Sequence, residues 1–208
     1  MLRLVVLDCD GVMFDSREAN RIYYNDLLSA FDCGPMDETE LTYVHMHNVT
    51  DSVNFIFRNH HRQDMAEVHK YRTELDYTPY LSHMILEPDL VAFLDNIQSC
   101  CKLAISTNRS STMRPLLERF GLSSYFQMVV TSLDVKNPKP APDALLDILA
   151  YFDCPASDAI YIGDSVVDRQ HAAAAGVSLI AFKNPQLPAE YHVNSFTEIL
   201  LLPPFVRS

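Results

Sequence analysis

Five short apolar runs alternate with helical patterns along most of this chain. A continuous run of Val, Ile and Leu is typical of a strand buried on both faces of a parallel sheet, with helices as the connections. The predicted strands are residues 4–7, 102–106, 128–131, 159–162 and 177–182. We therefore expect an α/β fold, with a Rossmann-like three-layer core built on a parallel sheet.

One long stretch interrupts this alternation. More than 90 residues separate the first predicted strand from the strand at 102–106, and their pattern is helical. A crossover between parallel strands needs only about a dozen residues or more. The surplus predicts an inserted α-helical cap subdomain at residues 16–81, so that residues 1–15 and 82–208 form the core domain.

Two carboxylates follow the first predicted strand, in the sequence Asp8-Cys9-Asp10-Gly11. The carboxyl ends of parallel strands lead to the crevice where open α/β sheets bind ligands. Side chains at i and i+2 share one face of a strand, and two anions that close repel each other unless a cation or a proton lies between them. The pair indicates a nucleophile, a metal ion and a general acid/base together. An Asx turn before the glycine is the structural alternative.

Further polar side chains follow other predicted strands. Thr107 and Asn108 follow the strand at 102–106, Lys139 lies in a proline-rich loop, and Asp164 and Asp168 follow the strand at 159–162. Each has an ordinary structural reading, as a helix cap, a solvated lysine or an acid near a helix N-terminus. Because all lie after strands of one predicted sheet, their combination indicates a single site at its carboxyl edge.

Composition excludes several classes of partner. The formal net charge is -11 and the pI is about 5.0, which argues against binding to nucleic acid or to an anionic membrane. The apolar stretch at the amino terminus is too short for a signal-peptide core, and no run approaches a membrane span. The five cysteines are odd in number and lack zinc-binding spacing. We expect a cytoplasmic protein, and the sequence leaves its oligomeric state open.

Taken in order, these motifs resemble the haloacid dehalogenase-like (HAD) hydrolase superfamily, in its C1-capped branch of phosphoglycolate phosphatase and β-phosphoglucomutase. The resemblance covers nearly the whole chain, and the helical insertion corresponds to the cap. The motifs that carry it are the sequences at 8–12, 107–108, 139–143 and 163–168.

The resemblance implies a catalytic role for both acids of the first motif. Asp8 would be the nucleophile that forms an aspartyl-phosphate, and Asp10 would be the general acid/base. Thr107, Asn108 and Lys139 would bind the phosphate. The substrate would be a small phosphorylated metabolite.

The resemblance also implies a Mg²⁺ site. Asp8, the backbone carbonyl of Asp10 and Asp164 would hold the ion, because hard oxygen ligands suit Mg²⁺. Asp168 would lie beside the metal or on Lys139, and we favour a supporting role outside the ligand set. A second aspartate at position 10 favours phosphate ester chemistry. Hydrolysis is the first expectation, while a phosphomutase of the β-phosphoglucomutase type and a non-catalytic ligand-binding regulator stay open.

Substrate choice is expected to depend on the cap. His47, Asn48 and Asn20 are the candidate cap contacts, and Arg109 is a candidate from the core because the strand end aims it at the site. His45 is expected as a surface residue near a helix end. The polar sequence at 58–62 is expected to be a solvated face.

Overall fold

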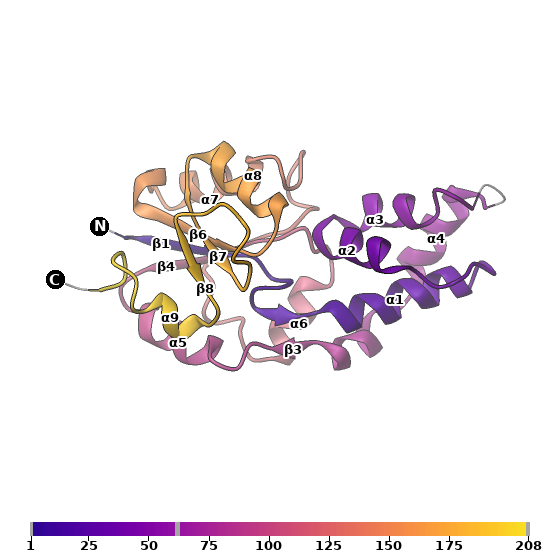
Figure 1. Ribbon diagram of the computed structural model, residues 1–208, viewed down its shortest axis with the longest axis horizontal. Helices are drawn as coiled ribbons and strands as arrows, with labels where there is room; N and C mark the ends of the chain where they lie inside the picture. The colour runs from indigo at the N-terminus through magenta and orange to yellow at the C-terminus, as the bar shows by residue number, and fades with distance from the viewer. Residues whose placement is uncertain (1, 61–62, 207–208) are drawn as a thin grey trace.

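The computed structural model describes residues 2–60 and 63–206, and it places a sheet-based core beside a helical cap (Figure 1). Within the described residues, the core sheet has six strands, all parallel, in the order β5-β4-β1-β6-β7-β8. The strands are β1 (Leu4–Leu7), β4 (Lys102–Ser106), β5 (Met128–Val130), β6 (Ala159–Gly163), β7 (Ser178–Phe182) and β8 (Tyr191–Val193).

Helices cover both faces of this sheet. Val5 and Leu7 of β1 face a layer made by α5 (Leu90–Ile97), α6 (Met113–Arg119) and α9 (Phe196–Ile199). Leu4 and Val6 face the opposite layer, made by α7 (Asp143–Tyr151) and α8 (Val166–Ala175). Alternate side chains of a strand point to opposite faces, so a strand buried on both sides must be apolar throughout. The predicted three-layer α/β fold is confirmed.

The cap is a helical unit with an apolar cluster of its own. It contains α1 (Arg17–Ser29), α2 (Glu38–Met46), α3 (Val49–Ile56), α4 (Met65–Glu74) and the 3₁₀ helix η1 (Thr78–His83). Tyr23, Leu27, Leu41, Val53 and Val68 are buried members of its cluster. In Figure 1 these helices extend from one end of the core, far from both chain termini.

Two short strands connect the cap to the core. β2 (Phe14–Asp15) pairs with β3 (Ile85–Leu86) in antiparallel fashion, with Phe14 opposite Leu86 and Asp15 opposite Ile85. The predicted cap, residues 16–81, lies between these two strands. The chain therefore leaves the core and returns to it at one place, on the side where the site lies.

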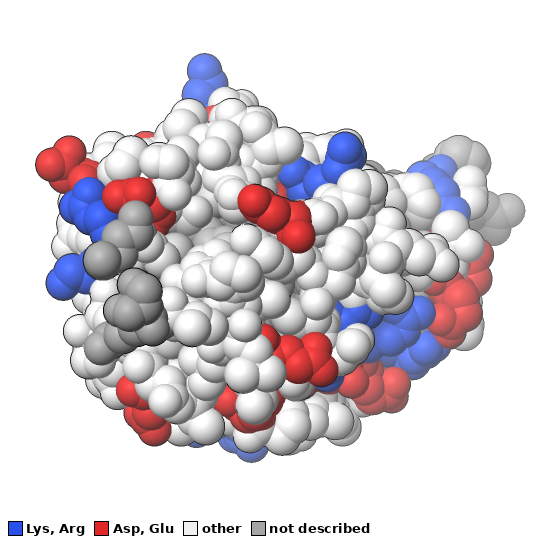
Figure 2. Space-filling model, turned by 60° about the vertical axis from the view of Figure 1, so that its left-hand side comes forward, with Lys and Arg blue, Asp and Glu red and all other residues white. Residues whose placement is uncertain are grey.

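The surface offers no dominant patch of one charge on the face drawn in Figure 2. Among the described residues seen there, Lys and Arg side chains are interspersed with Asp and Glu. No described helix is both long enough and apolar enough to cross a membrane.

Candidate active site

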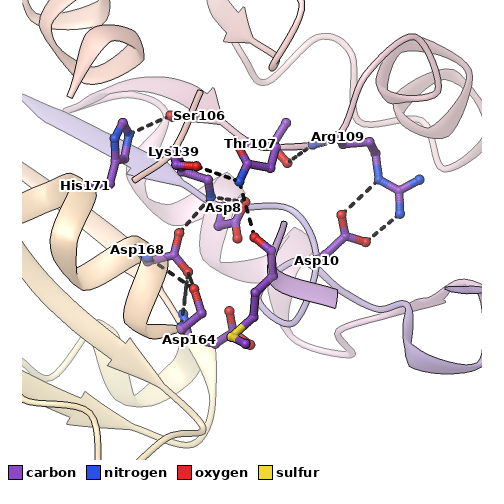
Figure 3. Close-up of polar contacts among 12 residues, drawn as sticks. Asp8, Asp10, Ser106, Thr107, Arg109, Lys139, Asp164, Asp168 and His171 are labelled. Atoms are coloured by element: carbon purple, nitrogen blue, oxygen red, sulfur yellow. Dashed lines mark hydrogen bonds and ion pairs between the residues drawn. The ribbon is translucent and has the colours of Figure 1, made fainter. Parts of the chain in front are cut away.

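The carboxyl ends of β1, β4 and β6 converge at the face of the core that the cap covers (Figure 3). Asp8 follows β1, Thr107 follows β4 and Asp164 follows β6, while Lys139 comes from the loop before α7. Asp8, Thr107 and Lys139 line a cavity of about 200 Å³ that is formed by residues of both the core and the cap. The structure thus places these side chains, which the sequence analysis expected at one site, at the same edge of the sheet.

Lys139 lies between two buried acids. Its Nζ is 2.8 Å from Asp8 Oδ1 and 2.7 Å from Asp168 Oδ1. Burial alone would lower the pKa of Lys139, but the charges of Asp168 and Asp8 outweigh burial and raise it. The lysine is therefore a fixed cation at the floor of the cavity, where it would attract phosphoryl oxygens.

Three carboxylates gather at the same point. Asp8, Asp164 and Asp168 each offer an oxygen within 4.8 Å of the others. Burial, followed by repulsion from Asp168, raises the pKa of Asp8 to about 7, and burial with repulsion from Asp168 and Asp8 raises the pKa of Asp164. Such a cluster is unfavourable as anions unless a cation neutralises it. The donor set fits a hard divalent ion such as Mg²⁺.

Asp168 has other partners that set it apart from the other two acids. It accepts hydrogen bonds from Tyr161 Oη at 2.9 Å and from Ser165 Oγ at 2.6 Å, and it closes the capping box of α8 with Ser165. Lys139 and these bonds occupy its oxygens, so Asp8 and Asp164 are left with oxygens for a metal ion. This geometry supports the predicted supporting role of Asp168.

A glycine makes room for this cluster. Gly11 has a φ of +78°, in the left-handed region, and a Cβ placed on it would overlap the carboxylate of Asp164. Only glycine adopts this conformation without strain while leaving space for the acid. The position explains why a glycine follows the two aspartates.

Asp10 is held by an arginine. The Nε of Arg109 is 3.1 Å from Asp10 Oδ2, and its second nitrogen, Nη2, bonds to Oδ1 at 2.5 Å, so the pair is bidentate (Figure 3). Burial alone would raise the pKa of Asp10, but the Arg109 guanidinium outweighs burial and lowers it. Arg109 also donates to Tyr77 Oη at 3.4 Å, in the segment that leads from the cap back to the core. Arg109 was expected to contact the substrate. In the structure its guanidinium is instead bonded to side chains of the protein itself.

Asn108 joins three segments rather than pointing a free donor at the cavity. Its Nδ2 donates to the backbone carbonyl of Lys139 at 3.1 Å and to that of Met46 in the cap at 3.2 Å. Thr107 is buried in the cavity wall and its Oγ1 accepts from the Arg109 amide at 3.1 Å. Of the three predicted phosphate-binding residues, Thr107 and Lys139 present groups to the cavity, and Asn108 fixes the loop that carries Lys139.

Sequence reasoning missed a buried polar network behind the site. His171 Nδ1 lies 2.6 Å from the Ala141 carbonyl, and His171 Nε2 lies 2.9 Å from Ser106 Oγ. Tyr161 Oη accepts from Lys139 Nζ and also lies near the Ser106 carbonyl oxygen, each at 3.0 Å. These groups connect β4, β6, α8 and the Lys139 loop. The only sequence signal was a tyrosine and a histidine in otherwise apolar elements, where buried polar groups need partners.

The predicted cap contacts have different surroundings. Asn20 and His47 line the cavity. Asn20 Nδ2 is 3.3 Å from His45 Nδ1, and His47 stacks on Tyr43 with ring centroids 3.8 Å apart. Asn48 instead caps α3, because its Oδ1 accepts from two backbone amides at the start of that helix.

His45 was expected at the surface, and this expectation was wrong. It lines the cavity, and burial lowers its pKa against the opposing charge of Asp10. The sequence at 58–62 is only partly described. Arg58 is exposed, stacks over Phe55 and pairs with Glu40 at 2.6 Å, whereas residues 61–62 lie outside the described residues.

The match to a family model decides the family. The model of haloacid dehalogenase-like hydrolases matches residues 5–182. This chain belongs to that family. The match includes all four motifs, so the resemblance seen in the sequence is confirmed.

Named relatives in this family include phosphatases. A ribulose-1,5-bisphosphate 5-phosphatase of Halopiger xanaduensis is 35% identical over 109 residues, which cover 51% of this chain and 46% of the relative. The match thus spans about half the length of that relative. A phosphoglycolate phosphatase of Rhodobacter capsulatus is 24% identical over 100% of this chain and 98% of its own length.

Solved structures share the fold. A subfamily IA HAD hydrolase from Geobacter sulfurreducens has a TM-score of 0.85 and 35% identity, covering 97% of this chain and 100% of that one. A β-phosphoglucomutase from Clostridium difficile has a TM-score of 0.84 at 17% identity, covering 96% and 93%. At that identity the second likeness concerns the fold alone.

Proposed function

We propose that the protein is a Mg²⁺-dependent phosphatase that hydrolyses a small phosphorylated metabolite through an aspartyl-phosphate on Asp8. The observation that carries this proposal is the position of Asp8 at the cavity floor, beside the cation Lys139 and the acids Asp164 and Asp168. A carboxylate between a fixed cation and a cation-binding cluster is suited to attack an anionic phosphoryl group.

The two chemical steps follow from this placement. Asp8 attacks phosphorus and the ester oxygen leaves with a proton, which Asp10 supplies as general acid. Asp10 then takes a proton from the water that hydrolyses the aspartyl-phosphate. Lys139 and Thr107 bind the phosphoryl oxygens throughout. The low pKa of Asp10 keeps it deprotonated, which is the form that the second step needs. The contact with Arg109 stabilises this form and so opposes the protonated form that the first step needs.

The metal site would use groups already in place. Asp8, the backbone carbonyl of Asp10 and Asp164 would hold Mg²⁺, which when bound neutralises charge on the phosphoryl group. The substrate is proposed to be a metabolite because the cavity is small and the cap covers it. Cys9, Cys33, Cys100 and Cys154 are free thiols, which supports the proposal of a cytoplasmic protein.

The proposal is tested with p-nitrophenyl phosphate, measured with Mg²⁺ and with excess chelator. We expect turnover only with Mg²⁺, and none in Asp8→Asn, because an amide keeps the shape of the carboxylate but is a far poorer nucleophile. Circular dichroism checks that the variant is folded. Substantial turnover by pure, folded Asp8→Asn contradicts the covalent mechanism.

Two alternatives give different results in the same assay. A mutase would transfer the phosphoryl group between sugar phosphates without stoichiometric release of inorganic phosphate, so free phosphate is measured as well. A non-catalytic regulator would release none from any substrate of a phosphorylated-metabolite panel.

A further inference from the structure

Among the described residues, three side chains of Lys or Arg line the cavity, and they differ in their partners. Lys139 pairs with Asp8 and Asp168, and Arg109 pairs with Asp10. The third, Arg72, has no ion pair with any residue in the described part of the chain. Its Nε is buried and has no hydrogen-bond partner there. Arg72 is thus the cavity cation whose charge the described protein groups leave unmatched.

No described group around Arg72 neutralises its positive charge. It lies in the last turn of α4, and its charge acts on the hydroxyl of Tyr23. Burial raises the pKa of that hydroxyl to about 12, and Arg72 offsets only part of the effect. The Tyr23 ring packs edge-on against Tyr24 and Tyr77, with centroids 4.9 and 5.0 Å apart. A charged donor beside an aromatic wall is costly when unpaired, and an anionic acceptor would satisfy it.

Arg72 and the phosphoryl-binding groups belong to one cavity but to different domains. Lys139 and Thr107 line it from the core, and Arg72 lines it from the cap. We propose that Arg72 binds a second anionic group of the substrate, a carboxylate or a second phosphate, while the scissile phosphate lies at Asp8. This rests on the proposed phosphatase function and narrows its substrates to phosphate esters that carry another negative charge.

The test measures binding, so that it does not depend on turnover. Asp8→Asn protein with Mg²⁺ is titrated calorimetrically with matched pairs of ligands. Phosphoglycolate and hydroxyethyl phosphate differ in a carboxylate, and ribulose 1,5-bisphosphate and ribulose 5-phosphate differ in a second phosphate. We expect the doubly anionic member of at least one pair to bind about 10- to 100-fold more tightly, as for a charge-assisted hydrogen bond. The pair that shows the preference identifies the second anion.

Variants then assign the preference to Arg72. Arg72→Gln should bring the ratio of affinities within the preferred pair close to one. Arg72→Lys should leave an intermediate ratio, because it keeps the charge but not the bidentate donor geometry. Lys70→Gln removes one positive charge from the exposed side of the same helix, outside the cavity, and should leave the ratio unchanged.

The outcomes separate this inference from the proposed function. Equal affinity within both pairs, or a preference that survives Arg72→Gln, overturns the inference. If Arg72→Gln does not fold, a wild-type ratio in Arg72→Lys overturns it instead. Absence of turnover by the wild-type chain, together with an Arg72-dependent binding preference, overturns the phosphatase proposal alone.

Discussion

Protonation of His171 should destabilise the fold. This histidine is buried, and its pKa is lowered from 6.5 to about 4, first by burial and then by the charge of Lys139. The neutral ring fits its partners, because one nitrogen can donate to the Ala141 carbonyl while the other accepts from Ser106. The unfolded chain binds a proton near pH 6.5 and the folded chain does so only near pH 4. The stability that depends on the neutral ring is therefore complete above pH 6.5 and is lost as the pH falls toward 4.

The two pKa values give the size of the loss. Between about pH 7.5 and pH 5, this one group should lower the free energy of unfolding by about 2 kcal/mol, and by about 3 kcal/mol once the pH is below 4. The comparison is with His171→Gln, which is neutral at every pH. The chain has no tryptophan, so urea unfolding is followed by circular dichroism, with chelator present in all samples. Equal losses of stability in the two proteins between pH 7.5 and pH 5 would refute the reasoning.

Two substitutions test other parts of the site. Gly11→Ala should weaken Mg²⁺ binding by at least about 10-fold, because the added Cβ would displace the Asp164 carboxylate; the shift in melting temperature with Mg²⁺ measures this. Gly34→Ala is the control, since a Cβ there meets nothing within 4 Å, and equal Mg²⁺ responses in both variants would contradict the role of Gly11. Arg109→Gln should raise the pKa of Asp10, which must be protonated to act as general acid in the first step, so the alkaline limb of the kcat/KM profile should move to higher pH. An unmoved limb would mean that Arg109 does not control this acid.

The sequence was most informative where a local pattern has a single physical explanation. Strands buried in a sheet are typically continuous apolar runs, so β1, β4, β5, β6 and β7 of the core could be predicted. The strand β8 (Tyr191–Val193) was missed because the exposed His192 at its centre leaves no continuous apolar run. The linking strands β2 and β3 have two residues each and no detectable period.

Pairings between distant residues could not be predicted in the same way. The Asp10–Arg109 ion pair joins residues 99 positions apart, and the Ser106–His171 bond joins residues 65 positions apart. Residue type and strand position brought these side chains to one sheet edge, but the choice of partner depends on packing that a single sequence does not encode locally. Asn48, by contrast, makes contacts that the neighbouring sequence does indicate. A short polar side chain before a helix has a local use as a cap, and that use accounts for its contacts.

The antiparallel pair of β2 and β3 makes the cap a replaceable module. Asp15 and Ile85 face each other across the two strands, so a single short turn could join them and delete everything between. The register of the parallel sheet does not depend on the removed segment, since the described residues of that segment contribute no strand to the sheet. Caps of different length and shape could thus be exchanged at this one junction while the reaction chemistry of the core stays the same. Over evolutionary time, such a junction lets new substrates be acquired without redesign of the catalytic machinery.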